Sequence, residues 1–160
     1  MQDKKKKIIL ICTFVIFLII IEQVIKAIIP KQEKLVLIQN VLNVSYVENR
    51  GAAFGIGNND TITFIIISII IISMVVRFLL TQLERLDRFV LISLVLILAG
   101  GVGNLIDRVF RGYVIDFVDI TPVLKFPIFN LADIYITLGW VLFIVATIRN
   151  YIKNVKKGTI

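Results

Sequence analysis

The sequence contains no histidine, and this absence excludes several kinds of active site. Ser-His-Asp and Cys-His catalytic machinery and His-ligated metal sites all depend on an imidazole. The single cysteine, Cys12, can form neither an internal disulfide bond nor a thiolate metal cluster. Any chemistry must therefore use carboxylates, hydroxyls, amides or basic groups.

Charged residues are also scarce, at 18% of the 160 residues, whereas soluble domains contain roughly 25%. Apolar residues make up 58% of the chain. This length is typical of one domain, but the chain is too apolar to bury its apolar surface within one water-exposed globule. We therefore expect a single integral membrane domain that covers residues 1–160.

Four apolar stretches are long enough for transmembrane helices, since a helix needs about 20 residues to cross the hydrocarbon core. The predicted spans are residues 8–29, 62–80, 89–106 and 131–148. The first follows four lysines, as a secretory signal peptide would, but it is longer than such a segment and ends without a small-residue cleavage site. We expect it to be a retained anchor.

The two longer connections are predicted on one side of the membrane, as segments 30–61 and 107–130. Within them, residues 35–49 have the composition of a short strand pair, and residues 113–118 that of one strand. Six Lys and Arg residues and seven acids fall on this side, against eleven and three on the side of the termini. Basic residues accumulate in cytoplasmic segments, so both termini are predicted to be cytoplasmic. The net charge of +7 then sets topology and does not indicate nucleic-acid binding.

Two acids lie where an acid is costly in a membrane protein. Asp133 is one turn inside the fourth span, and Asp116 stands between apolar neighbours in a short extended stretch. An ionisable group in a span costs about 2.5–3.5 kcal/mol at mid-helix, which makes it a functional candidate. Asp133 also has a structural explanation, because Asn130 is a plausible N-cap and an acid in the first turn favours the helix dipole.

A glycine-rich segment, residues 100–103, ends the third span. It permits close approach of another backbone, at a functional site or simply for helix packing, and we expect both roles. If Asp116 and Asp133 converge nearby, they share a proton, because two close carboxylates do not both ionise. The ionised acid can draw a proton from water while the protonated acid polarises a carbonyl, as in aspartic proteases. This chemistry requires no His, Cys or metal.

Four sequence blocks together resemble the signature of the lipoprotein signal peptidase family, and their order and spacing match over nearly the whole chain. They are Glu48-Asn49-Arg50-Gly51-Ala52-Ala53-Phe54-Gly55, Gly103-Asn104-Leu105-Ile106-Asp107-Arg108, Val114-Ile115-Asp116-Phe117 and Phe129-Asn130-Leu131-Ala132-Asp133. The resemblance implies a membrane all-α fold, a bundle of four transmembrane helices. A small β-sheet lobe and an interfacial helix, formed by segment 35–57, are expected on its outer face.

The resemblance also implies a function: an aspartic endopeptidase of the bacterial plasma membrane that removes signal peptides from prolipoproteins. Cleavage would occur before a Cys that carries a diacylglyceryl group, with Asp116 and Asp133 as catalytic acids. The positions that match dyad-supporting or substrate-binding residues are Asn49, Asn104, Asp107, Arg108 and Asn130, and Asp107 is expected to pair with Arg108. No cofactor or metal is implied. The expected partners are the prolipoprotein and membrane lipids, and the enzyme is expected to be a monomer.

The sequence departs from the family pattern at two positions. Glu22 stands where the first span usually has Asp, and Ile134 follows the second acid where Ser is frequent. Glu22 and Lys26 are four residues apart and can pair on one helix face, so we expect them to give structural support. Ile134 cannot supply the hydrogen bond to Asp133 that a serine hydroxyl could.

The main alternative function is that of a small transporter or channel subunit. In that case Asp107, Asp116 and Asp133 would relay protons or bind cations, and acids near spans do not by themselves exclude this. The three acids gather at one face of the membrane instead of crossing it, which favours the peptidase.

Overall fold

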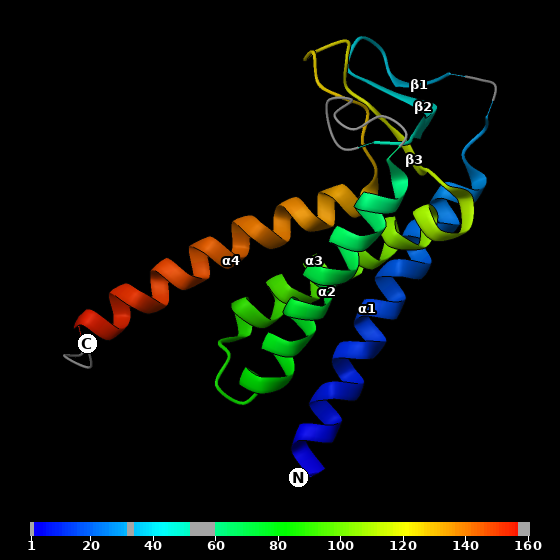
Figure 1. The fold of residues 1–160 in the computed structure, drawn as a ribbon. Helices are drawn as coiled ribbons and strands as arrows, with labels where there is room; N and C mark the ends of the chain where they lie inside the picture. The colour runs from blue at the N-terminus through cyan, green and yellow to red at the C-terminus, as the bar shows by residue number, and fades with distance from the viewer. Residues whose placement is uncertain (1, 32–33, 52–59, 157–160) are drawn as a thin grey trace.

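The computed structural model describes residues 2–31, 34–51 and 60–156 (Figure 1). Each of its four helices is long and apolar enough to cross a membrane. The helices are α1 (Gln2–Ile28), α2 (Thr61–Gln82), α3 (Arg88–Arg111) and α4 (Leu131–Lys156), and the strands are β1 (Leu35–Ile38), β2 (Leu42–Asn49) and β3 (Val114–Asp119). The predicted bundle of four helices with a small sheet is confirmed.

Helix α3 is the centre of the bundle. In its most apolar stretch 56% of the residues are buried, against 11% in α1, 6% in α2 and 17% in α4. The other helices expose many large apolar side chains, including Phe14, Ile62 and Val145. Apolar surfaces of this extent suit helices that are surrounded by lipid.

Helices α3 and α4 approach closely where glycine removes a side chain. A Cβ atom at Gly100 would lie 2.3 Å from the carbonyl oxygen of Ala132, and one at Gly139 would lie 2.7 Å from Cγ1 of Ile97. Small residues permit this kind of close helix contact in membranes. The glycine-rich segment therefore allows the first turn of α4, which carries Asp133, to pack directly against α3.

The three strands form an antiparallel sheet in the order β1-β2-β3. The sheet lies at the end of the bundle opposite both termini (Figure 1). In the register of β2 and β3, Val47 is opposite Asp116 and Asn49 is opposite Val114. All three predicted strands are present, whereas residues 52–57, the end of the segment in which the interfacial helix was expected, lie outside the described residues.

Helix α3 continues past the predicted end of the third span at Ile106 and ends at Arg111. Gly112 terminates it in a left-handed conformation with φ of 79°, and its N–H donates a hydrogen bond to the carbonyl oxygen of Arg108. The predicted outer segment, which begins with Asp107 and Arg108, therefore starts as a continuation of this helix. Both residues lie on the last turns of α3.

Candidate active site

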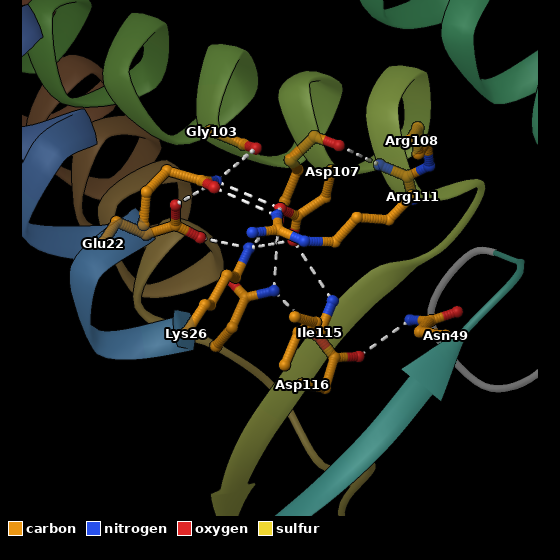
Figure 2. Close-up of polar contacts among 12 residues, drawn as sticks. Glu22, Lys26, Asn49, Gly103, Asp107, Arg108, Arg111, Ile115 and Asp116 are labelled. Atoms are coloured by element: carbon orange, nitrogen blue, oxygen red, sulfur yellow. Dashed lines mark hydrogen bonds and ion pairs between the residues drawn. The ribbon is translucent and has the colours of Figure 1, made fainter. Parts of the chain in front are cut away.

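Asp116 lies on β3 and is only 3% exposed. The Nδ2 atom of Asn49 donates a hydrogen bond to its Oδ2 at 2.9 Å, a contact visible in Figure 2. The Nδ2 atom of Asn130 donates a hydrogen bond to its Oδ1 at 2.7 Å. Strand β2 and the residue that precedes α4 thus orient this carboxyl group with two neutral amides.

Asp133 lies in the first turn of α4 and takes part in the N-terminal cap of that helix. Its N–H donates to Oδ1 of Asn130 at 2.9 Å, and its Oδ2 accepts from the N–H of Asn130 at 3.1 Å. This reciprocal arrangement has the form of a capping box. The remaining oxygen, Oδ1, accepts from Nδ2 of Asn104 at 2.8 Å. The predicted cap is therefore present, and it holds Asp133 in place at the site.

Asn130 is fully buried and links the two acids. Its Nδ2 donates both to Asp116 and to Oδ1 of Asn104, the latter at 3.1 Å, while its Oδ1 accepts from the backbone of Asp133. One residue, through its side chain and its backbone N–H, thereby sets the position of one carboxyl group relative to the other.

Burial and the nearby Asp133 carboxylate raise the pKa of Asp116 to about 6. Hydrogen bonds from Asn49 and Asn130 and the charge of Lys26 act in the opposite direction but do not outweigh these two effects. The structure thus brings Asp116 and Asp133 into one electrostatic unit.

Both acids line a cavity of about 850 Å³. Its polar part also contains Asn49, Asn104 and Arg108, and most of the remaining wall is apolar, from residues 126–129 and from Ile134, Ile136 and Leu138. A few polar groups that converge in a mostly apolar cavity are typical of a site for a small or extended ligand. Ile134 belongs to this wall, and both oxygens of Asp133 accept hydrogen bonds without a serine hydroxyl at that position.

Arg108 lies on the cavity wall and does not form the predicted pair with Asp107. Its Nη2 donates to the carbonyl oxygen of Gly51 at 3.2 Å, and its guanidinium lies 5.5 Å from the ring centroid of Phe64. Neighbouring residues of a helix point about 100° apart, so Arg108 faces the cavity while Asp107 faces α1. The expectation of an Asp107–Arg108 pair was wrong for this reason.

Asp107 instead belongs to a buried ion cluster between α1 and α3, which consists of Glu22, Lys26, Asp107 and Arg111 (Figure 2). The Nζ atom of Lys26 lies 2.6 Å from Oδ2 of Asp107 and also contacts Glu22, the pair predicted from their spacing. Arg111 contacts the other oxygen of Asp107. The cluster contains two cations and two anions, so its formal charges balance.

Sequence reasoning missed two members of this region, Arg111 and Gln23. Gln23 donates to Oδ1 of Asp107 at 3.1 Å and accepts from Arg111 at 3.0 Å. Arg111 stands four residues after Asp107, which is the spacing of a helical ion pair. This spacing can be seen in the sequence, but it indicates an ion pair only if the helix continues beyond Ile106, the predicted end of the apolar span.

Asp119 is a further buried acid at the sheet end of the bundle. It is 2% exposed and ends β3. A hydrogen bond from Lys34, followed by those from Thr121, holds the pKa of Asp119 below its usual value. Ser45 also donates to it at 3.3 Å. Asp119 therefore joins the segment before β1 to β2 and to the end of β3.

Comparison with known proteins identifies the family. A sequence profile described as Signal peptidase (SPase) II matches residues 14–149. The chain belongs to the signal peptidase II family. It is 34% identical over 154 residues to the lipoprotein signal peptidase of Streptococcus pneumoniae, with 93% of this chain and 99% of that protein covered. It is 40% identical over 107 residues to the lipoprotein signal peptidase of Streptococcus thermophilus, with 67% and 69% covered.

Two solved structures of bacterial membrane enzymes share the fold. One has a TM-score of 0.81 and covers 88% of each chain, and the other has a TM-score of 0.75 and covers 86% of this chain and 91% of its own. Both are 35% identical in sequence to this protein. The resemblance on which the sequence analysis relied is confirmed. The chain is a multi-pass bacterial membrane protease of the lipoprotein signal peptidase type, and a transporter or channel function is not favoured.

Proposed function

We propose that this peptidase hydrolyses prolipoproteins by aspartic catalysis, with Asp116 and Asp133 as the catalytic acids. The observation that supports this most strongly is the buried Asn130, which contacts both carboxyl groups at the polar end of the cavity. Aspartic catalysis needs two carboxyl groups in fixed relative positions that can exchange protons with a substrate and a water molecule. The three asparagines orient these groups without supplying a compensating positive charge.

In the proposed reaction, Asp116 begins protonated and Asp133 begins ionised. Asp133 takes a proton from a water molecule as the water oxygen bonds to the scissile carbonyl carbon, and Asp116 gives its proton to the carbonyl oxygen. In the second step Asp133 returns its proton to the amide nitrogen, and Asp116 recovers one from a hydroxyl group of the intermediate. The C–N bond then breaks, which yields a carboxylic acid and an amine and leaves both acids as they began.

The pKa of Asp116 supports this assignment of the shared proton. At about 6 it lies well above the ordinary aspartate value of 3.8, because of burial and the carboxylate of Asp133. Its hydrogen-bond donors, Asn49 and Asn130, are neutral amides that are compatible with either protonation state. Asp116 is therefore the acid that we expect to polarise the carbonyl group.

The cavity wall supports a lipidated substrate whose scissile bond lies before a diacylglyceryl-modified Cys. Leu138 lines the cavity and is also 54% exposed on the apolar face of α4, so the cavity is continuous with the lipid-facing surface. A substrate could thus enter sideways while its acyl chains stay in the bilayer. We also propose that both termini are cytoplasmic, as their basic residues indicate, and that the cavity lies near the outer face of the plasma membrane.

The remaining polar residues are assigned supporting roles. Asn49, Asn104 and Asn130 orient the two carboxyl groups, and Arg108 is placed on the cavity wall to bind the substrate backbone. Asp107 is fully buried in the ion cluster and supports the site from the side that faces α1. We also propose that residues 1–160 form a single domain and that the enzyme is a monomer.

The proposed substrate and cleavage position can be tested on purified enzyme with a diacylglyceryl-modified prolipoprotein and the same precursor without the lipid, both in isotopically labelled water. We expect mass spectrometry to show a lipidated Cys at the new N-terminus and one labelled oxygen in the carboxylate of the released signal peptide. The unmodified precursor should remain largely intact. Equal cleavage of both precursors would contradict the lipid requirement, and cleavage of neither by folded enzyme would contradict the function.

A further inference from the structure

Lys26 is buried within the bundle, with a side chain that is 0% exposed. Its ammonium group contacts three side-chain oxygens, which belong to Glu22, Asp107 at 2.6 Å and Asn104 at 3.2 Å. An ammonium group has three protons and no acceptor, so these contacts match its full donor capacity. The third acceptor, Asn104, is also the residue that donates to Asp133.

The contact with Lys26 determines which end of the Asn104 amide faces Asp133. The amide oxygen, Oδ1, accepts from Lys26 and from Asn130, which leaves Nδ2 to donate to Asp133 at 2.8 Å. If the amide were turned end for end, its NH₂ group would face an ammonium and its oxygen would face a carboxylate. Both contacts would then be repulsive, and Asp133 would lose a donor.

A second chain of contacts leads from Lys26 to the strand that carries Asp116. The Oδ2 atom of Asp107, which accepts from Lys26, also accepts from the backbone N–H of Ile115 at 3.2 Å (Figure 2). Ile115 directly precedes Asp116 on β3. One buried cation on α1 therefore contacts the supports of both acids.

We propose that Lys26 is a positioning residue for catalysis, which orients Asp133 through Asn104 and holds β3 beside Asp116 through Asp107. This inference rests on the proposed function of the two acids. Lys26 is not among the residues that line the cavity in the described part of the chain, so it acts through other side chains and does not contact substrate. It should therefore affect the rate of the chemical step and leave substrate binding unchanged.

The sharpest test is the double variant Lys26→Met/Glu22→Gln. It removes one cation and one anion from the ion cluster, so Asp107 and Arg111 still balance each other and no buried charge is left without a partner. The matched control is Glu22→Gln alone, which keeps the ammonium of Lys26 and its hydrogen bond to Asn104 but leaves two cations beside one anion, so it is expected to unfold at a lower temperature. Unfolding temperature is measured for both variants so that turnover can be expressed per folded enzyme.

We expect the double variant to lose roughly 10- to 100-fold in kcat, the effect of a small misplacement of reacting groups, with KM almost unchanged. The control should keep most of its kcat. The pH profile gives a second readout, because the charge of Lys26 lowers the pKa of Asp116 while burial and Asp133 raise it. The alkaline limb of kcat/KM should therefore move to higher pH in the double variant and stay near its original position in the control. The limb reports the loss of the Lys26 charge near Asp116, whereas the loss in kcat with KM unchanged is the readout that a merely structural role would not produce.

A folded double variant with the kcat and alkaline limb of the wild type would overturn the inference. If the methionine variant does not fold, Lys26→Gln/Glu22→Gln takes its place, because two amides can hydrogen bond in the same space. A neutral glutamine has an acceptor as well as donors and no longer fixes the Asn104 amide, so the same losses are expected and the same result would overturn the inference. Asp116→Asn tests the proposed function separately: if it is inactive while the double variant is fully active, the catalytic acids stand and the positioning role does not.

Discussion

The ion cluster and the catalytic pair each contain two acids, all buried except the half-buried Asp133, but the two regions differ in what surrounds those acids. In the cluster, Glu22 and Asp107 contact the cations of Lys26 and Arg111. In the catalytic pair, Asp116 and Asp133 accept hydrogen bonds from asparagine side chains and from backbone. Cations stabilise the ionised form of an acid, whereas neutral amides orient it in either form. The first region is therefore built for ion pairing and the second for proton exchange.

The largest expected effect comes from removing one anion of the ion cluster with Asp107→Asn. This change leaves the buried cation of Lys26 and the half-buried cation of Arg111 with one anion, and breaking a buried pair in this way costs about 3–5 kcal/mol of folding free energy. Unfolding of the purified protein in detergent measures the effect. The matched control is Asp116→Asn, the same isosteric change in the catalytic pair, which turns one accepting oxygen into a donor but leaves no charge without a partner, so it should lower the unfolding free energy by only about 1 kcal/mol. Equal destabilisation by both variants would contradict the distinction between the two regions.

A smaller effect is expected in the pH dependence of stability. The pKa of Asp116 in the folded protein, about 6, lies above its ordinary value of 3.8, so the folded state binds the proton more tightly than the unfolded state. Its contribution to stability is present below pH 4 and is lost as the pH rises through 6, by up to about 3 kcal/mol.

This dependence can be measured as the unfolding free energy between pH 4 and 7 for the wild type and Asp116→Asn. The wild type should lose stability relative to the variant as the pH rises over this range. Parallel curves for the two proteins would show that Asp116 titrates normally, and the assignment of the shared proton would then be wrong.

Much of the fold could be predicted because it depends on features that are local in sequence. The length of each apolar stretch revealed the four spans, and the strand-like residues between turns revealed the three strands. Asp116 and Asp133 stood out because an acid in an apolar stretch needs an explanation. Asn130 could be assigned both a capping and a supporting role, and the structure shows that one set of hydrogen bonds can serve both.

The features that could not be predicted depend on contacts between distant segments. The apolar residues alone predict that the third span ends at Ile106. Helix α3 continues to Arg111 because α1 supplies partners for its last polar turns. Asp107 and Arg108 are adjacent in sequence, yet helical geometry turns them toward different neighbours. The burial of Asp119 likewise depends on Lys34 and Ser45, which no local pattern connects to it.

The central claim is that Asp116 and Asp133 perform the hydrolysis while the ion cluster supports them. Its most direct test is the single-turnover rate of cleavage of a diacylglyceryl-modified prolipoprotein by purified Asp116→Asn and Asp133→Asn, with unfolding temperature measured on the same samples. We predict that each variant cleaves at least about 10³-fold more slowly than the wild type and unfolds within a few degrees of it. Cleavage at the wild-type rate by either folded variant would contradict the account.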